Sequence, residues 1–269
     1  MTWFIALLFG FVQGLTEFLP VSSSGHLALI SMLTLENSDI FFTVLLHAAT
    51  FISVCAAFRG DVSELLRAAL TFVPDRVKRR PVTQWQRLLE LMAVSLFPLA
   101  FAVPFRSRIE ALFESPAAIG LALIATALLV LLSDRFGKGR KTLRDIKFRD
   151  ALIIGLVQAA AIIPGLSRSG ATLAAALFCG LDRDTAVKYS FILSLPTVLA
   201  AAALESAEAF AAGISPARLG PYALGFAAAA VTGYASIGLV RVLTGKGRLK
   251  YFSIYTAALG TGLLLSRLF

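Results

Sequence analysis

Long apolar runs separated by short polar segments dominate the chain. Six of these runs have the length of about 20 residues that an α-helix needs to cross a lipid bilayer. They lie at about residues 40–58, 88–105, 116–133, 185–204, 219–240 and 251–268. The pattern predicts an all-α integral membrane protein.

Two further apolar stretches are interrupted near their middle by polar residues, proline and glycine. The first covers residues 3–32 and breaks at Pro20 to His26, and the second covers 151–180 and breaks at Pro164 to Gly170. Irregular backbone at membrane depth must be buried in protein or line a wet cavity, because lipid offers no hydrogen bonds. We therefore predict two re-entrant helix–loop–helix elements, which together with the six spans give about ten helices.

The two broken stretches align with each other at an offset of 145 residues, so that Gln13 matches Gln158 and Ser22 matches Ser167. Each half of the chain then holds one re-entrant element and three spans. Because three is an odd number, the second half must be inverted relative to the first, an architecture that places a site where the broken elements meet. The predicted repeats are residues 1–133 and 151–269, joined by a cytoplasmic linker at 134–150.

Positive charge is distributed unevenly over the segments between the spans. The chain has 25 Lys and Arg and a net charge of +9, and twenty of these basic residues lie in one set of segments: 59–87, 134–150, 181–188 and 241–250. Basic segments stay in the cytoplasm. We therefore expect both termini and the first re-entrant element to open to the extracytoplasmic side. Topology explains the charge better than a nucleic-acid partner does.

Composition narrows the choice of class further. Apolar residues make up 58% of the chain and charged residues 15%, with a mean hydropathy of +0.81. These values exclude a disordered chain, a disulfide scaffold and most soluble enzymes. Cys55 and Cys179 lack metal-ligand spacing. The sequence has no Walker A or Gly-x-Gly-x-x-Gly motif, so we expect no organic cofactor.

The first break is dense in reactive side chains. Glu17 would lie at membrane depth, where a carboxylate is costly unless it is paired or wet, and it shares a helix face with Gln13. Ser22 to Ser24 precede a half-helix, where they can cap it or help to bind an anion. His26 beside them favours acid–base or nucleophilic chemistry over a purely structural role, whereas His47, inside an apolar span, is interpreted as mostly structural.

The second break adds a fixed positive charge. Arg168 is the one basic residue of its apolar stretch, and Ser167 and Ser169 flank it. Arginine binds phosphate through two parallel hydrogen bonds. Gly170 lets the backbone approach an anion. The Thr172 hydroxyl either helps to bind that anion or forms a local hydrogen bond to the backbone of its own helix. A carboxylate, hydroxyls, an imidazole and a guanidinium around one anion are what phosphoryl transfer requires.

Two segments, QGLTEFLPVSSSGH at 13–26 and PGLSRSG at 164–170, resemble those of the bacterial undecaprenyl-diphosphate phosphatases, also called bacitracin-resistance proteins. The resemblance implies hydrolysis of undecaprenyl diphosphate to undecaprenyl phosphate and inorganic phosphate in the bacterial plasma (inner) membrane. This reaction recycles the lipid carrier of peptidoglycan synthesis and confers bacitracin resistance. The expected partners are therefore the isoprenyl diphosphate lipid and the bilayer.

The resemblance also implies site residues. Glu17, Ser23, His26 and Arg168 are expected to be catalytic, with Ser23, His26 or water as the nucleophile. The expected substrate-binding residues are Gln13, Ser22, Ser24, Gly25, Ser167, Ser169, Gly170 and Thr172. Many members carry a second glutamate where this chain has Gln13, so any Mg²⁺ or Ca²⁺ is expected to arrive with the diphosphate near Glu17 and to keep most of its waters.

Two alternatives from different functional classes stay open at this point. One is a non-enzymatic protein that binds and sequesters the lipid, which would show no turnover at all. Inverted repeats with broken helices are also the architecture of secondary transporters. The chain could therefore be a flippase or transporter of the isoprenyl phosphate carrier. The density of Glu, Ser, His and Arg side chains favours hydrolysis, because transport alone needs no activated nucleophile.

Overall fold

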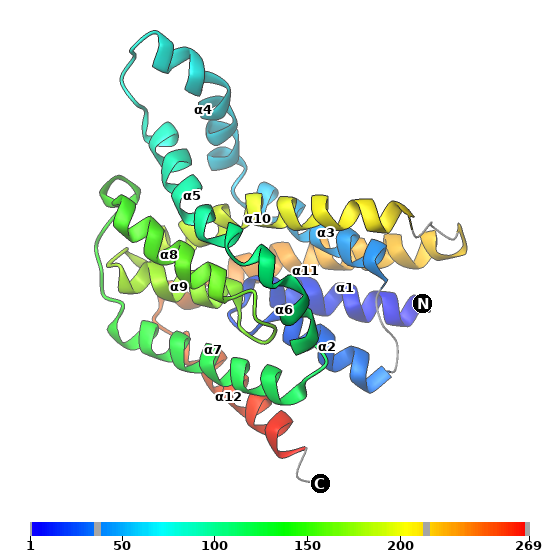
Figure 1. Ribbon diagram of the computed structural model, residues 1–269. Coiled ribbons are helices and arrows are strands. Elements are labelled where there is room, and N and C mark those ends of the chain that lie inside the picture. The colour runs from blue at the N-terminus through cyan, green and yellow to red at the C-terminus, as the bar shows by residue number, and fades with distance from the viewer. Residues whose placement is uncertain (1, 35–38, 212–215, 267–269) are drawn as a thin grey trace.

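The structure, a computed structural model, describes residues 2–34, 39–211 and 216–266 (Figure 1). These residues form α-helices and short 3₁₀ helices, and the β-type pairing among them is one isolated bridge between Lys141 and Leu181. The predicted all-α membrane protein is confirmed. Long apolar helices satisfy every backbone hydrogen bond internally, which is the condition for lying in lipid.

The helices follow one another in the order α1 (Trp3–Phe18), α2 (Ser23–Thr34), α3 (Ile40–Ala57), α4 (Arg59–Val77), α5 (Gln84–Ala100), α6 (Arg106–Leu112), α7 (Pro116–Phe136), α8 (Phe148–Ala160), α9 (Arg168–Phe178), α10 (Arg183–Ala211), α11 (Leu219–Gly245) and α12 (Lys250–Leu265). Three 3₁₀ helices lie at Val103–Phe105, Leu143–Asp145 and Pro216–Arg218. Within the described residues, α4 and α6 are the helices that the sequence pattern did not predict.

Four helices are long and apolar enough to cross a membrane: α3, α7, α11 and the Arg183–Ala203 part of α10. The predicted spans at 88–105 and 251–268 are shorter than expected, since α5 ends at Ala100 and α12 has 16 residues. Proline explains the end of α5, because Pro98 and Pro104 lack the backbone donor that continues a helix. The order in which the chain crosses the membrane stays a prediction.

Helix α4 lies in the basic segment 59–87, where we expected a loop between two spans and no helix. The α4–α5 hairpin projects from the helix bundle (Figure 1). A capping box begins α5, in which Thr83 and Gln86 exchange hydrogen bonds of 3.0 and 3.2 Å. The Gln86 amide also donates to Asp75 at 2.9 Å and so ties the two helices together. The many charges of α4 hid it from a search for apolar runs.

The two broken elements pack against their neighbours in the same way. Helix α1 lies along α11, and α8 lies along α5. A Cβ on Gly10 would lie 2.1 Å from the Gly225 carbonyl oxygen, and one on Gly155 would lie 2.4 Å from that of Ser95. Gly10 and Gly155 are 145 positions apart, so the packing has the period of the sequence repeat. Backbones this close require glycine, because any side chain would collide.

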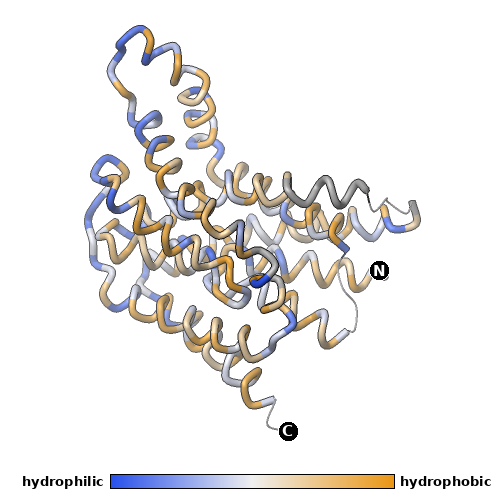
Figure 2. Tube along the Cα trace, in the orientation of Figure 1, coloured by the Kyte–Doolittle hydropathy of each residue, from blue (hydrophilic) through white to orange (hydrophobic). Residues whose placement is uncertain are grey.

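Hydrophilic residues gather at two places, the tip of the α4–α5 hairpin and the edge formed by the segment between α7 and α8 (Figure 2). The helices between that edge and the opposite side of the bundle are mainly apolar. Helix α1 begins and α12 ends on the side away from this hydrophilic edge (Figure 1). The segments 59–87 and 134–150 each contain seven Lys and Arg against three Asp and Glu, so the bundle has a basic face that includes both regions.

Candidate active site

The breaks in the two interrupted elements face each other. Helix α1 ends at Phe18 and α2 begins at Ser23, while α8 ends at Ala160 and α9 begins at Arg168. The backbone N–H of Gly165 donates to the Ser24 hydroxyl at 3.4 Å across the gap. Ser23 and Arg168 are thus the first residues of two half-helices that meet at one site.

A serine caps each of these half-helices. The Ser22 hydroxyl accepts from the Gly25 N–H at 3.3 Å, and the Ser167 hydroxyl accepts from the Gly170 N–H at 3.1 Å. Such caps satisfy backbone donors that a helix start leaves free. Ser22 has a φ of 71°, in the left-handed region. The chain therefore turns sharply just before Ser23.

Glu17 is the hub of the polar contacts. Its side chain is 4% exposed. One carboxylate oxygen accepts from the Ser23 hydroxyl at 2.7 Å and from the Gln13 amide at 3.1 Å. The other oxygen accepts from the Arg168 guanidinium. A hydroxyl at hydrogen-bond distance from a carboxylate is the arrangement of a nucleophile and its base.

Arg168 connects this hub to a third helix. Besides Glu17, its guanidinium donates to the Thr197 hydroxyl on α10 at 3.2 Å. Its side chain is 26% exposed. Two bonds use only part of the five N–H groups of a guanidinium. The other donors have no partner among the described residues and can bind an anion.

A cavity of about 510 Å³ lies beside these groups. Its polar wall consists of Glu17, Ser22, Ser23, Ser24, His47, Gln158, Ser167, Arg168 and Thr197. The rest of the wall is apolar and comes from the C-terminal ends of α5 and α8, the middle of α10 and the region of α6. Its residues are Leu99, Ala102, Ile109, Phe113, Ala161, Ile162, Leu166, Val198, Ala200 and Ala201. The cavity therefore suits a ligand with an anionic head and an apolar chain.

Some residues predicted to contact the substrate are not among the described residues that line this cavity. They are Gln13, Gly25, Ser169, Gly170 and Thr172. Ser169 donates to the Leu19 carbonyl at 3.2 Å. Thr172 donates to the Arg168 carbonyl at 2.9 Å and shares a hydrogen bond with Ser190. The side chains of Ser169 and Thr172 therefore stabilise the backbone at the two breaks and do not line the cavity.

His26 also lies apart from the cavity lining. Its Nδ1 donates to the Ser22 carbonyl at 2.7 Å, so Nε2 of the neutral ring accepts from the Tyr255 hydroxyl at 2.7 Å. The two rings stack with their centroids 5.6 Å apart. The imidazole thereby holds the turn before Ser23 against α12.

Four residues at the site were not assigned to it from sequence. His47, Gln158 and Thr197 line the cavity. Thr126 donates to the Gly165 carbonyl at 3.2 Å and accepts from the Ser167 N–H at 2.9 Å, which fixes the second break. In the sequence these four residues differ from their neighbours only as polar residues within apolar runs. Many such residues form hydrogen bonds only within their own helix, so this feature did not identify them.

The cavity does not suit a metal ion held by the protein. Among the described residues there is no group of three or more His, Cys, Asp or Glu side chains placed to bind one. Glu17 is the one carboxylate of the cavity wall, and both its oxygens already accept hydrogen bonds. Mg²⁺ and Ca²⁺ need several oxygen ligands.

Comparison with known proteins shows that this sequence is similar to a family of membrane proteins and to several of its members. A family model described as bacitracin resistance protein BacA matches residues 6–262. The chain is 41% identical over 263 residues to an undecaprenyl-diphosphatase of Geotalea daltonii, a match that covers 97% of this chain and 96% of the relative.

Two further relatives carry the same name. The protein of Carboxydothermus hydrogenoformans is 37% identical, with 98% of this chain and 97% of the relative covered. That of Methanococcus maripaludis strain C7 is 38% identical, with 93% and 94% covered. The similarity thus runs over nearly the full length of each protein.

Proposed function

This chain belongs to the bacitracin resistance protein BacA family, and we propose that it hydrolyses undecaprenyl diphosphate to undecaprenyl phosphate and inorganic phosphate. The observation that carries the proposal is the Ser23 hydroxyl, 2.7 Å from the Glu17 carboxylate and beside Arg168 in a half-apolar cavity. The names of its relatives agree with this activity.

The two walls of the cavity match the two parts of such a lipid. Its diphosphate belongs beside Arg168 and the serines, where hydrogen-bond donors gather. The first part of its isoprenoid chain belongs against the apolar wall, which includes Leu99, Phe113 and Val198. A cavity that combines an apolar wall with a cluster of polar groups is typical of small-molecule recognition.

The reaction begins at Ser23. Its Oγ attacks the terminal phosphorus while its proton passes to Glu17, which the 2.7 Å hydrogen bond already aligns. The bond between that phosphorus and the bridging oxygen breaks, and undecaprenyl phosphate leaves with the electron pair. Arg168 compensates the charge of the transferring group, the main task in phosphoryl transfer.

A second step regenerates the serine. After the proton on Glu17 has passed to the departing phosphate or to water, Glu17 accepts a proton from a water that attacks the phosphoserine. The bond between Ser23 Oγ and phosphorus breaks, the proton returns to Oγ, and inorganic phosphate leaves. Direct attack by a water on the diphosphate, with Ser23 as a phosphate ligand, is the rival route.

The other site residues have positioning roles in this proposal. Gln13 orients Glu17, Thr197 orients Arg168, and His26 holds the turn that presents Ser23. As nucleophile, His26 is the weaker candidate, because both its ring nitrogens are hydrogen-bonded and it lies apart from the cavity lining.

A divalent cation enters this proposal only as part of the substrate. Because both oxygens of Glu17 are engaged, Mg²⁺ or Ca²⁺ would accompany the diphosphate and keep most of its waters. Chelation should then weaken substrate binding without unfolding the apo-protein.

The proposed location is the bacterial inner membrane, with both termini and the active site on the extracytoplasmic side. The support is that α1 begins and α12 ends on the side away from the basic face (Figure 1), and that basic segments stay in the cytoplasm.

Phosphate release by the purified protein in detergent tests the proposal, since detergent abolishes the two sides of a membrane. We expect release from undecaprenyl diphosphate and its loss in Ser23→Ala and Glu17→Gln. A flippase or transporter of the carrier would release no phosphate under these conditions, and that result would overturn the proposal.

A further inference from the structure

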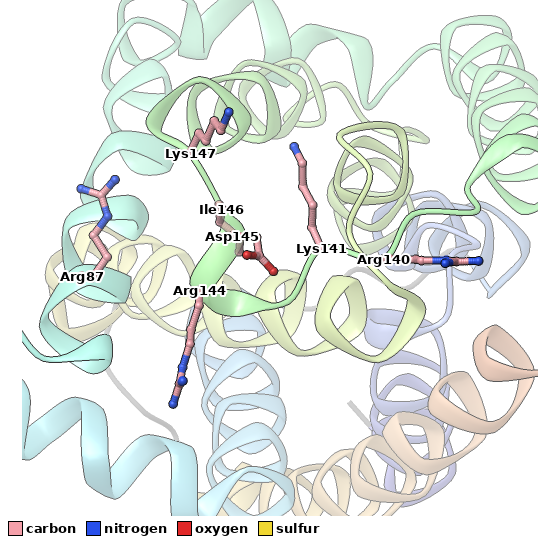
Figure 3. Close-up of a pocket in the computed structure, with 7 residues that line it drawn as sticks. All are labelled: Arg87, Arg140, Lys141, Arg144, Asp145, Ile146 and Lys147. Carbon is pink, nitrogen blue, oxygen red and sulfur yellow. The ribbon is translucent and has the colours of Figure 1, made fainter.

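A second pocket, of about 660 Å³, shares no lining residue with the candidate active site. It lies at the basic face, where the segment between α7 and α8 meets the start of α5. Its lining residues are Arg87, Arg140, Lys141, Arg144, Asp145, Ile146 and Lys147 (Figure 3). We call these seven residues the cationic pocket.

Three of the five basic side chains in the cationic pocket have a partner in the protein. Arg87 pairs with Glu90 at 3.3 Å. Lys141 pairs with Asp150 at 2.9 Å, and Arg144 donates to the neutral amide of Gln84. Arg140 and Lys147 are exposed, and their side chains have no hydrogen-bond or ion-pair partner among the described residues. With the carboxylate in the lining and the two that pair with lining residues, five basic side chains stand against three carboxylates, so the pocket keeps a net positive charge that favours an anion.

An apolar stripe leads away from the cationic pocket along α8. Phe148 follows Lys147 directly, and Phe148, Leu152 and Leu156 are all exposed. Their spacing of four residues puts them on one face of the helix. Arg87 stacks on the Phe148 ring, with its guanidinium carbon 3.8 Å from the ring centroid. The pocket and the stripe together resemble the outline of a phospholipid, with the head at one end and chains along the helix.

The other repeat has the stripe without the cations. Trp3, Leu7 and Phe11 of α1, each 145 positions before a member of the α8 stripe, are exposed as well. No Lys or Arg occurs before Arg59. An exposed apolar stripe is therefore an ordinary lipid contact in both halves. The cations are specific to the α8 end.

We propose that the cationic pocket binds the phosphate headgroup of an anionic phospholipid whose acyl chains lie along α8. Arg and Lys bind phosphate oxygens through charge-assisted hydrogen bonds. Basic pockets between helices at a membrane face suit such headgroups. A lipid satisfies both the pocket and the stripe, whereas free phosphate would use the pocket alone.

The test measures lipid bound to the intact protein in detergent, by native mass spectrometry, with phosphatidylglycerol as the probe. Arg140→Gln combined with Lys147→Gln should weaken binding by about 30-fold, since each basic residue near a membrane surface contributes about 1 kcal/mol. Lys246→Gln combined with Arg248→Gln is the matched control. It removes the same charges from two exposed residues of the α11–α12 loop on the basic face and should leave binding unchanged.

Phosphatidylcholine and inorganic phosphate serve as competitors that show which part of the lipid is recognised. Neither should displace phosphatidylglycerol from the protein. Equal losses of phosphatidylglycerol binding in the two double variants would overturn the proposal, because diffuse surface charge would then explain the binding. Competition by inorganic phosphate would also overturn it, because the pocket would then be a site for free anions. Phosphate release in detergent should stay near the wild-type rate in both variants, which shows that they fold. The binding measurement does not depend on turnover.

Discussion

Glu17 and Arg168, which are 151 positions apart, form an ion pair that joins the two helix breaks. Glu17 lies at the end of α1 and Arg168 at the start of α9, so neither break completes the site alone. A buried carboxylate needs a partner to stay charged. Arg168 meets this need and also lines the cavity.

Replacing Arg168 should abolish activity even when the positive charge is kept. Arg168→Lys loses the planar pair of donors that binds phosphate. We expect kcat/KM for phosphate release to fall by about 10³-fold, the scale of other arginine contributions to phosphoryl transfer. Arg168→Ala should be at least as inactive.

Folding must be checked beside that result, because Arg168→Ala leaves a buried charge unpaired, at a cost of about 3–5 kcal/mol. Arg241→Lys, at an exposed ion pair with Asp184, is the control and should keep full activity. A well-folded Arg168→Ala protein with near wild-type turnover would show that the site has been misplaced.

The three serines of the first break provide an internal comparison for the nucleophile. Ser23 alone donates to Glu17, whereas Ser22 caps α2 and Ser24 accepts from Gly165. Ser23→Ala should therefore be the most damaging of the three alanine variants, and Ser23→Thr should retain some activity. Any trapped phosphoenzyme should map to Ser23 by peptide mass spectrometry. Full activity in Ser23→Ala would leave attack by water as the mechanism.

Gln13 and Gln158 are equivalent in the repeat, yet they should respond in opposite ways to loss of the amide. Gln13 donates to Glu17, so Gln13→Leu should destabilise the protein by about 1.5–3 kcal/mol, the value of a hydrogen bond to a charged group. Both amide atoms of Gln158 are buried and have no hydrogen-bond partner among the described residues. Gln158→Leu should therefore be neutral or stabilising.

Thermal unfolding in the same detergent measures both glutamine variants. A midpoint that falls equally in the two variants would contradict the difference in their hydrogen bonding.

Substitution of Tyr255, the hydrogen-bond partner of His26, distinguishes a positioning role of His26 from a chemical one. If the imidazole acts by holding the Ser22 carbonyl, Tyr255→Phe should reproduce part of the loss seen in His26→Ala, because it removes the hydroxyl bonded to Nε2. In both variants we expect a larger decrease in kcat than the change in KM. Full activity in Tyr255→Phe beside an inactive His26→Ala would instead favour direct chemistry by the imidazole.

Sidedness is tested by cysteine labelling in intact cells, with Cys55 and Cys179 replaced. Ser115→Cys, at the start of α7, should react with an impermeant thiol reagent. Thr142→Cys, in the basic segment between α7 and α8, should react only after permeabilisation. Ser38, a further position suited to labelling, lies outside the described residues. The reverse pattern would place the active site on the cytoplasmic side.

Polar residues within apolar runs were the informative part of the sequence. A charge or a serine cluster at membrane depth is costly, so Glu17, the serines at 22–24 and Arg168 could be identified from the sequence, and the structure brings Glu17, Ser23 and Arg168 together. The breaks were visible for the same reason, because proline and glycine interrupt helices wherever they cluster.

The remaining features depend on tertiary contacts that periodicity does not encode. Helix α4 is held by Gln86 and by packing on α5, so its own hydropathy did not reveal it. His47 and Thr197 reach the cavity only because α3 and α10 pack beside the breaks. His26 sits next to the serines in sequence, but its side chain turns toward Tyr255, a direction that chain order alone does not give.

The size of the active-site cavity has a kinetic consequence. A volume of about 510 Å³ is that of a site for a drug-sized molecule, so most of a long isoprenoid chain must stay among the lipid tails while its head reacts. The enzyme then meets its substrate by diffusion in two dimensions. Its rate should follow the mole fraction of substrate in the membrane or micelle and fall as detergent is added at constant bulk concentration. An apparent KM in molar units would describe the micelle as much as the protein.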